Sequence, residues 1–365
     1  MNIIWNGPLL DPSGYGNCAR SYVEALYDKG HNVRVQPIQY FIGNPKKYMD
    51  KELYRLLVDL LMAPNILTSD FIHIEHKTPG AFTTGRYKKN IGYSVWETDR
   101  IPDVVVSNVN IKDELWTASE YSMRAFVNSG VRIPIKIIPH IIDTDKFYSD
   151  GKEVRTLIML FNGEFTYRKG IDVLVKSYLK AFKNTDDVML LMKTYLLSNK
   201  DAGSNYVRNT INGWIKEINP VNPPKIKILN ELISDEDLPK LYSCANVFVS
   251  PTRGEGFGIP IAEAMSSQNL VIVPDKGGHT DFCDSTNSIL IDSKIEPIDK
   301  GFLEEDRKAY SGQNWISPSE EHLVEVLKEV YNNYDRYRDI RIKARDTVEE
   351  YCSKDRIVSL MERNL

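Results

Sequence analysis

Short apolar runs alternate with longer amphipathic stretches along the first part of the chain. Residues 2–5 form a mostly apolar run typical of a buried strand, and residues 17–29 place apolar side chains at helical spacing. Gly30 follows this helix in the position of a C′ glycine, and residues 32–35 predict the next strand. Further strands are predicted at 71–75, 90–95, 114–118 and 135–138. Strands separated by helices of this length pair in parallel, so the pattern predicts a doubly wound α/β sheet.

The alternation starts again after a polar, turn-rich segment at residues 143–153, where we place a linker. Beyond it, strands are predicted at 156–161, 188–192, 225–229, 246–250 and 270–273, and helices at 171–182, 207–218 and 259–265. The tail from residue 334 onward also has helical spacing. The predicted fold class is therefore α/β, with two Rossmann-like domains in tandem whose ligands bind in a cleft at the carboxyl ends of the strands.

Two helix starts carry capping signals. Residues 117–120, Thr-Ala-Ser-Glu, have the pattern of a capping box in front of a helix at 121–129. Residues 317–320, Ser-Pro-Ser-Glu, combine a cap, a proline at the first helical position and a glutamate three residues after the cap. We expect this second helix to extend to about residue 331.

Length and composition narrow the class of protein. A chain of 365 residues exceeds the roughly 250–300 residues that one core supports, so two domains are expected. Lys and Arg number 46 against 50 Asp and Glu, and without a basic excess we expect no nucleic-acid partner. We see no apolar run of the roughly 18–20 residues that span a membrane, and no basic secretory-signal region. The four scattered cysteines predict reduced thiols in a cytoplasmic protein: Cys18, Cys244, Cys283 and Cys352.

The densest chemical signal is residues 252–265, Thr-Arg-Gly-Glu-Gly-Phe-Gly-Ile-Pro-Ile-Ala-Glu-Ala-Met, which follow an apolar strand and open a helix. Free amides at a helix start bind anions, and Gly256 and Gly258 let the backbone approach a phosphate. Glu255 precedes the helix, and Glu263 lies inside it, where a carboxylate can accept a pair of ribose hydroxyls. A plain strand–loop–helix with solvated glutamates is the alternative, but the interleaved glutamates and glycines are much more specific.

This segment resembles the Glu-x7-Glu motif of retaining glycosyltransferases with the GT-B architecture, family 4 (glycosyl transferases group 1), in a divergent form. The resemblance implies that Glu255 faces the donor sugar and that Glu263 holds the nucleotide ribose. It also implies that the intervening backbone meets the diphosphate and the sugar. The residues of that backbone are Gly256, Phe257, Gly258 and Ile259.

The same resemblance implies an architecture and an activity. The GT-B fold has two Rossmann-like domains facing a central cleft, here residues 1–145 on the acceptor side and 150–345 for the nucleotide-sugar donor. A C-terminal helix within 346–365 would pack on the first domain. The chain would be a hexosyltransferase that moves a sugar from a nucleotide-diphosphate sugar, with UDP favoured, to a hydroxyl of a glycan or glycolipid.

A second stretch supports the resemblance. Residues 162–170, Asn-Gly-Glu-Phe-Thr-Tyr-Arg-Lys-Gly, are similar to the family's strand-end loop, whose lysine binds the donor diphosphate. Carried over, Lys169 would act on the leaving group and Arg168 would supply a second cation. Glu164 departs from the pattern, since the family often has an arginine there.

The remaining site residues lie in the first half. His76 ends a predicted strand and matches the family's histidine near the reacting centre, although a buried histidine that only packs is the common alternative. Gly14, Tyr15 and Gly16 resemble the glycine loop that approaches phosphate and acceptor, and a simple turn is the alternative. The basic stretch 86–89 could meet an anionic acceptor or the inner membrane face, and a solvated loop is its alternative.

Two other function classes stay open. Residues 14–19, Gly-Tyr-Gly-Asn-Cys-Ala, spell a dinucleotide fingerprint typical of a nicotinamide dehydrogenase, but a long gap follows the first strand and the next strand ends without a carboxylate. A non-catalytic nucleotide-sugar-binding subunit is the other alternative. Asp143-Thr144-Asp145 spells the Asp-x-Asp of metal-dependent transferases, yet it falls in the linker. We therefore predict no metal and no other cofactor.

Overall fold

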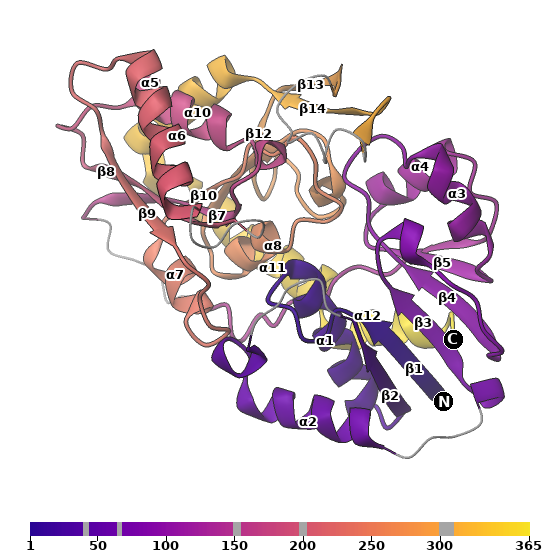
Figure 1. Cartoon of the computed structure of the whole chain (residues 1–365). Coiled ribbons are helices and arrows are strands. Elements are labelled where there is room, and N and C mark those ends of the chain that lie inside the picture. Colours follow the sequence, from indigo (N-terminus) through magenta and orange to yellow (C-terminus); the bar gives the residue numbers. More distant parts are fainter. Residues whose placement is uncertain (39–43, 64–67, 149–154, 197–202, 299–309) are drawn as a thin grey trace. The chain divides into compact units, whose positions relative to one another are not determined.

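The computed structural model describes residues 1–38, 44–63, 68–148, 155–196, 203–298 and 310–365. Residues 149–153 of the predicted linker lie outside them. The chain forms two compact units (Figure 1). Unit 1 contains residues 1–143, 233–236 and 351–365, and unit 2 contains residues 144–232 and 237–350.

Unit 1 is built on a six-stranded parallel sheet of order β2-β1-β3-β4-β5-β6 (Figure 1). Its strands are β1 (Asn2–Gly7), β2 (Asn32–Pro37), β3 (Ile72–His76), β4 (Lys89–Tyr93), β5 (Glu114–Thr117) and β6 (Ile135–Ile137). Its helices are α1 (Gly14–Asp28), α2 (Lys51–Met62), α3 (Asp103–Asn110), α4 (Glu120–Asn128) and α12 (Lys354–Glu362). Every residue of β3 and β5 is buried, as expected for central strands covered on both faces.

The last helix of the chain belongs to unit 1. Helix α12 lies beside α1, and an ion pair joins Lys29 Nζ to an Asp355 carboxylate oxygen at 2.9 Å. His31 Nε2 lies 2.9 Å from a carboxylate oxygen of Glu362. These surface pairs, together with the buried Ile357 and Val358, attach α12 to the first sheet domain.

Unit 2 repeats the architecture with the sheet order β12-β11-β10-β7-β8-β9. Its parallel strands are β7 (Leu157–Glu164), β8 (Val188–Tyr195), β9 (Lys225–Asn230), β10 (Val247–Val249), β11 (Leu270–Pro274) and β12 (Ile289–Ile291). A separate hairpin pairs β13 (Ser293–Pro297) antiparallel with β14 (Asn314–Pro318). The helices are α5 (Ile171–Ala181), α6 (Gly203–Ile218), α7 (Leu238–Cys244), α8 (Ile259–Ser266), α10 (Glu320–Asn333) and α11 (Arg338–Tyr351), and the short 3-10 helix η4 is Tyr167–Lys169.

The predicted alternation of strands and helices is confirmed in both units, but the two capping predictions are wrong in position. Ser119 caps α4, because its hydroxyl accepts the Ser122 N–H, whereas Thr117 still pairs in β5. Ser319 caps α10 by accepting the His322 N–H. Pro318 is the last residue of β14 rather than the first of a helix, since Ser317 and Pro318 still pair with β13.

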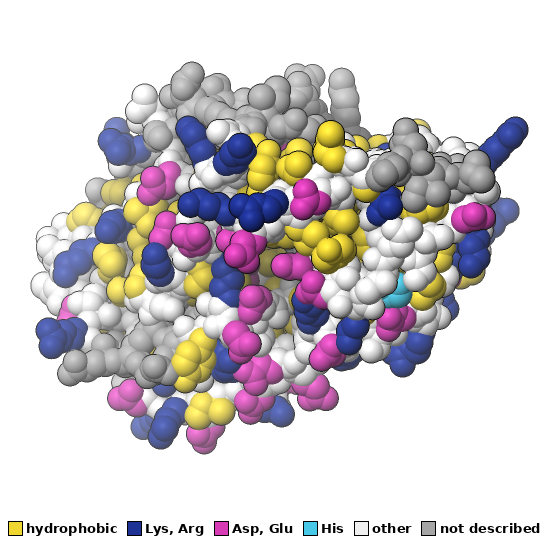
Figure 2. Space-filling view, turned by 90° about the horizontal axis from the view of Figure 1, so that it is seen from below, with side chains coloured by type: hydrophobic (Ala, Val, Ile, Leu, Met, Phe, Trp, Pro, Cys, Tyr) yellow, Lys and Arg dark blue, Asp and Glu magenta, His cyan; other side chains and the backbone are white. Residues whose placement is uncertain are grey.

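The surface carries mixed charge. On the face shown in Figure 2, basic and acidic side chains are interspersed. Of the predicted basic stretch 86–89, Lys89 is half-buried and pairs with Glu114 at 3.3 Å, and its ammonium also donates to the Asn364 carbonyl. Among the described helices, none is both long and apolar enough to cross a bilayer.

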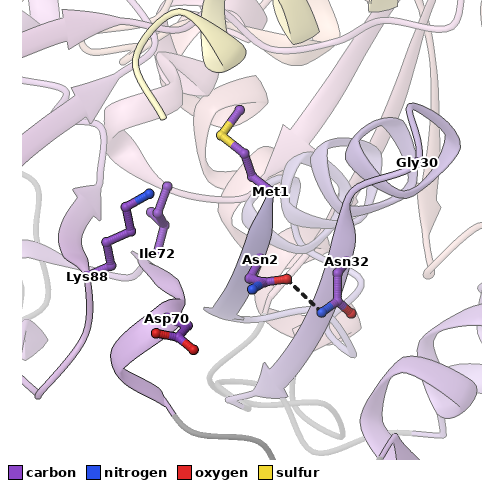
Figure 3. Close-up of a pocket in the computed structure, with 7 residues that line it drawn as sticks. All are labelled: Met1, Asn2, Gly30, Asn32, Asp70, Ile72 and Lys88. Carbon is purple, nitrogen blue, oxygen red and sulfur yellow. Dashed lines mark hydrogen bonds between the residues drawn. The ribbon is translucent and has the colours of Figure 1, made fainter.

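A polar pocket lies at the amino ends of the first three strands, where the Asn2 side-chain oxygen accepts a hydrogen bond from the Asn32 side-chain amide at 2.9 Å (Figure 3). Its lining residues are Met1, Asn2, Gly30, Asn32, Asp70, Ile72 and Lys88. Doubly wound sheets bind ligands at the opposite edge, beyond the carboxyl ends of the strands. The pocket is therefore separate from the predicted site.

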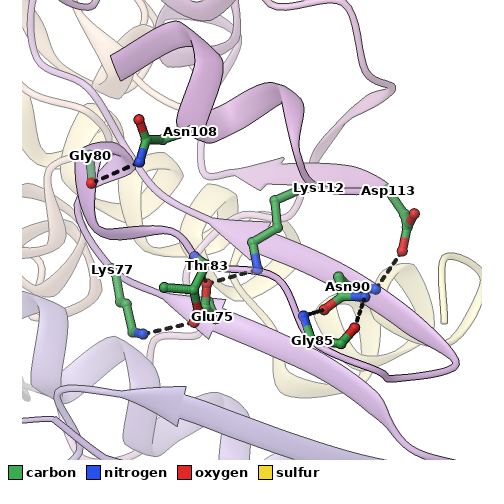
Figure 4. A network of polar contacts seen from close by, with 9 residues as sticks. All are labelled: Glu75, Lys77, Gly80, Thr83, Gly85, Asn90, Asn108, Lys112 and Asp113. Carbon is green, nitrogen blue, oxygen red and sulfur yellow. Dashed lines mark hydrogen bonds and ion pairs between the residues drawn. The ribbon is translucent and has the colours of Figure 1, made fainter. Parts of the chain in front are cut away.

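A buried charge network holds the carboxyl end of β3 (Figure 4). Glu75 forms an ion pair with Lys112 Nζ at 2.7 Å, and it accepts hydrogen bonds from Lys77 Nζ at 2.8 Å and from the Thr83 N–H at 2.7 Å. Burial by itself would raise the pKa of Glu75, but these donors outweigh burial and lower its pKa to about 2. The network fixes the strand that ends in His76.

Candidate active site

The predicted donor motifs meet at the topological switch point of the unit 2 sheet. Strands β7 and β10 are neighbours, and the chain proceeds from β7 to one side and from β10 to the other. The loop after β7 leads into η4 with Arg168 and Lys169, and the loop after β10 carries Glu255. Ligands of doubly wound proteins bind where the loops diverge in this way.

Glycine 170 allows the two loops to touch. Its φ is +67°, and a Cβ added to it would lie 1.8 Å from the Pro251 carbonyl oxygen. The Arg253 N–H donates to the Arg168 carbonyl oxygen at 2.7 Å. A residue with a side chain at position 170 would force the loops apart, so the cationic loop and the glutamate loop form one packed unit.

Lys169, Arg168 and Glu255 form a compact charged cluster. Lys169 Nζ donates to a Glu255 carboxylate oxygen at 2.6 Å, and the Arg168 guanidinium lies 4.0 Å from the other oxygen. Burial tends to raise the pKa of Glu255, but the charges of Lys169 and Arg168 outweigh it and lower the pKa. Glu255 is therefore an ionised, buried carboxylate with two cations beside it.

The backbone around Glu255 is held from a second side. The Gly278 N–H donates to the Glu255 carbonyl oxygen at 2.8 Å, and a Cβ on Gly278 would lie 2.4 Å from the Gly256 backbone. Gly258, with φ at +102°, is the N-cap of α8, which begins at Ile259. Phe257 is buried against Phe282 with ring centroids 4.9 Å apart, so its side chain belongs to the core and only its backbone is placed for a ligand.

Glu263 lies in the second turn of α8 and is also buried. One of its carboxylate oxygens accepts the Tyr242 O–H at 2.6 Å, and the Asn162 side-chain amide donates to the Tyr242 hydroxyl at 2.8 Å. Burial, with the charge of Glu263, raises the pKa of Tyr242 and keeps its hydroxyl a donor. This chain of hydrogen bonds orients Glu263 from the end of β7.

Arg253 is a functional candidate that we did not predict. Its guanidinium makes a bidentate pair with Asp172 at 2.7 and 2.8 Å and donates to the Tyr167 carbonyl oxygen at 2.7 Å. It also stacks over the Tyr167 ring at 3.6 Å. The arginine thus ties the Glu255 loop to η4, and its place inside the motif was the signal that could have revealed it.

The unit 1 candidates form a second group. His76 ends β3 and is buried, with the ring of Tyr15 at 5.0 Å and that of Tyr93 at 4.5 Å between centroids. Burial, and to a smaller extent the electrostatic interaction with His140, lowers the pKa of His76, which is therefore neutral. The Tyr15 hydroxyl lies 3.3 Å from the Ser94 hydroxyl.

The glycines of this group have a structural role. Gly14 is the first residue of α1. A Cβ on Gly16 would lie 2.1 Å from the Asp11 carbonyl oxygen, so the turn needs glycine there. The predicted site residues therefore fall into two sets, one at the carboxyl edge of each sheet.

A buried thiol–imidazole–phenol cluster lies beside His76. His140 Nδ1 is 2.8 Å from Cys18 Sγ, 3.0 Å from the Tyr22 hydroxyl and 3.2 Å from the Tyr93 hydroxyl. Burial lowers the pKa of His140 to about 3 and raises the pKa of Cys18. Both groups are neutral, so the cluster packs and orients the site rather than transferring protons.

Within the described ranges, no three His, Cys, Asp or Glu side chains are grouped as ligands for a metal ion. Asp143 and Asp145 are both exposed. The charges available at the unit 2 site are those of its lysine, arginine and glutamate side chains.

Residues 156–298 match the family model described as Glycosyl transferases group 1. This segment is a group 1 glycosyltransferase domain. The match includes the Arg168–Lys169 loop and both motif glutamates, and it confirms the family expected from those motifs. Apart from residues 233–236, the matched segment lies within unit 2.

The curated relatives include proteins named as glycosyltransferases. O-antigen chain mannosyltransferase B of Escherichia coli is 35% identical over 109 residues, 29% of this chain and 26% of that protein. Uncharacterized protein 356 of Sulfolobus islandicus rod-shaped virus 1 is 22% identical over 342 residues, 88% of this chain and 85% of that protein. The chain spans about half or less of the length of the first curated relatives that it matches.

The fold is matched over the whole chain. The crystal structure of Anabaena Alr3699/HepE in complex with UDP and glucose superimposes with a TM-score of 0.71 at 14% identity, covering 100% of this chain and 99% of that one. This likeness confirms the predicted fold class, two Rossmann-like domains of the GT-B type.

Proposed function

We propose that the protein is a retaining glycosyltransferase that moves a sugar from a nucleoside-diphosphate sugar to a hydroxyl group. The ion-paired cluster of Lys169, Arg168 and Glu255 at the switch point of the group 1 domain carries this proposal. A UDP-sugar is the favoured donor, in keeping with the complex of Alr3699/HepE with UDP and glucose. The favoured acceptor is a glycan or glycolipid, at the cytoplasmic side of the cell.

The cluster suits the chemistry of a departing diphosphate. Negative charge grows on the leaving group as the sugar is released, and preorganised donors stabilise it most when they are held in place beforehand. Lys169 and Arg168 are held in place by Glu255, by the Gly254 carbonyl oxygen and by the packed loops. We assign them to the diphosphate, Glu255 to the donor sugar, and Glu263 to the ribose.

The acceptor side of the reaction is assigned to unit 1. His76 is neutral and buried at a strand end, so a ring nitrogen can accept a hydrogen bond from a sugar hydroxyl. Tyr15 lies next to it in the first turn of α1. We propose that this group contacts the reacting centre and the acceptor.

Slow release of nucleoside diphosphate from a panel of UDP-, GDP- and ADP-sugars tests the function without knowledge of the acceptor. We expect hydrolysis of at least one donor, and we expect Lys169→Ala to slow it by a factor corresponding to about 2–3 kcal/mol, the effect of losing one preorganised donor. Lys240→Ala, which removes an exposed lysine paired with Asp237, is the matched control and should leave the rate unchanged.

Three outcomes separate the alternatives. Equal rates for the wild-type protein, Lys169→Ala and Lys240→Ala would place the phosphates elsewhere. Binding of a nucleotide sugar without release of its nucleotide, even with a range of glycan acceptors, would indicate a non-catalytic binding subunit. Absence of nucleotide binding together with binding of a nicotinamide dinucleotide would support a dehydrogenase.

A further inference from the structure

Lys193 is a buried lysine that the motifs do not account for. It lies near the carboxyl end of β8, and only 7% of its surface is exposed. Across the described part of the chain, no hydrogen-bond acceptor or carboxylate lies within bonding distance of its ammonium, which faces the Tyr195 ring at 4.6 Å. The buried Lys112, by contrast, has a Glu75 oxygen at 2.7 Å.

Such a side chain is costly for a folded protein. A buried ammonium loses its hydration, and a direct ion pair or a set of hydrogen bonds normally replaces it. Burial lowers the pKa of Lys193 to about 8, although the charge of Glu263 raises it. A ligand that places a negative charge beside the ammonium would offset the free-energy cost of burying Lys193.

The position of Lys193 indicates which ligand. Lys193 pairs in register with Asn162 of β7, and Asn162 bonds to the Tyr242 hydroxyl that holds Glu263. Two residues further along β8, Tyr195 interacts electrostatically with Arg168 and Glu255. Lys193 therefore lies at the strand edge between the carboxylate assigned to the ribose and the cations assigned to the diphosphate.

We infer that Lys193 is a third cation of the donor site and that its ammonium binds a phosphate of the bound nucleoside diphosphate. This inference rests on the proposed function. Without Lys193, the side chains Arg168 and Lys169 are opposed by Glu255 and Glu263, so the fixed charges cancel. A diphosphate needs further positive charge, and a desolvated ammonium forms a strong charge-assisted hydrogen bond with a phosphate oxygen.

The test is a comparison of Lys193→Met with the wild-type protein in calorimetric titrations of uridine, UMP and UDP. Methionine keeps the length of the side chain and removes its charge. We expect the affinity for UDP to fall about tenfold or more, as for the loss of one hydrogen bond to a charged group. The affinity for uridine should not change. Lys225→Met, at the exposed amino end of β9, is the control and should bind all three ligands normally.

A stability measurement distinguishes ligand binding from a structural role. Removal of an unpaired buried cation should leave the unfolding temperature of the ligand-free protein unchanged or raise it. A lowered unfolding temperature together with weaker binding would make Lys193 a structural counter-ion of Glu263 and overturn the inference. Unchanged UDP affinity, or an equal loss for uridine and UDP, would overturn it as well.

The same titrations separate this inference from the proposed function. If the wild-type protein binds none of UDP, GDP and ADP, the proposed function fails, and the inference fails with it. If the wild-type protein binds a diphosphate other than UDP, the nucleoside, monophosphate and diphosphate of that base replace the uridine series. Normal wild-type binding that Lys193→Met leaves unchanged overturns the inference alone.

Discussion

At the scale of single residues, burial decides which groups of the site carry charge. Glu255 is buried and still ionised because two cations adjoin it. His76 is buried without such a partner charge, so its pKa falls and the ring is neutral. Two buried ionisable groups thus differ in charge because their neighbours differ.

Glu263→Ala should chiefly weaken nucleotide binding. The ribose hydroxyls would lose a charged acceptor, an interaction of about 1.5–3 kcal/mol. Calorimetry with UDP measures this loss, and Tyr242→Phe, which removes only the hydroxyl that orients Glu263, should show a smaller loss in the same direction. Unchanged affinity in Glu263→Ala would reject the assignment to the ribose.

Donor affinity should fall at alkaline pH because of Lys193. Its pKa of about 8 lies below that of an ordinary lysine, so the ammonium is charged below this pH and loses its proton above it. The groups that face it are Tyr195 and Glu263, and burial raises the pKa of Tyr195, so the tyrosine stays neutral in this range. A phosphate monoester has its second pKa at about 6, so the charge on the phosphates of the ligand is constant from pH 7 upward.

Measurement of UDP affinity between pH 7 and pH 10 checks the predicted direction of this pH dependence. We expect a decline through about pH 8 or somewhat above it in the wild-type protein, since the bound phosphate favours the protonated lysine. The decline should be absent in Lys193→Met and present in Lys225→Met. An identical pH profile in wild type and Lys193→Met would contradict the prediction.

At the scale of elements, one arginine joins the two loops that carry the chemistry. Arg253 follows β10, and its partners Tyr167 and Asp172 belong to η4 and the first turn of α5. Gly170 lies between them with a left-handed φ that a side chain would strain. The position of Lys169 relative to Glu255 is therefore set by an ion pair that contains neither residue.

Arg253→Leu should lower both stability and turnover. Loss of one partner of a largely buried ion pair costs about 3 kcal/mol of unfolding free energy, which urea denaturation measures. Displacement of Lys169 should slow turnover about 10- to 100-fold. Arg253→Lys keeps the charge without the bidentate geometry and should show a smaller stability loss with turnover still reduced.

A double-mutant cycle gives the control for this clamp. If Arg253 acts through Asp172, the effects of Arg253→Leu and Asp172→Asn on turnover should not add in the double variant. Additive effects, or normal turnover in Arg253→Lys, would show that the pair stabilises the fold without positioning Lys169.

At the scale of the whole molecule, we expect the charge needed for the leaving group to come from fixed side chains. The chain as a whole is slightly acidic, with a formal net charge of −4, so a binding site for an anionic donor depends on local cations. Arg168 and Lys169 are placed together by the switch point of one sheet. This placement is the basis of the metal-free mechanism that we predict.

Transfer or donor hydrolysis should persist in excess EDTA. Fixed donors can stabilise a diphosphate leaving group in place of a divalent cation. The measurement is the initial rate with and without chelator, followed by addition of Mg²⁺ or Mn²⁺. Abolition by EDTA with rescue by Mn²⁺ would contradict the prediction, and the alanine variants of Asp143 and Asp145 should then be inactive.

The local pattern of apolar residues was sufficient to predict most strands of both sheets. Apolar runs identified β3 and β7 because a central parallel strand is buried on both faces, and helical spacing identified α1 and α5. Helices α2 and α3 and the β13–β14 hairpin were not predicted from the sequence. The caps were misplaced because strand pairing, not the cap residue, sets where β5 and β14 end.

The sequence by itself determined the two domains, the family and the motif residues Glu255, Glu263, Arg168 and Lys169, because each motif is local and its residues share one loop or helix. Only the tertiary structure decided which side chains these residues contact. Arg253 meets Asp172 across 81 positions, and Lys169 meets Glu255 across 86. Such contacts depend on the order of strands in the sheet, which places β7 beside both β8 and β10. Local periodicity reports burial and backbone conformation, and it carries no information about which strand becomes the neighbour.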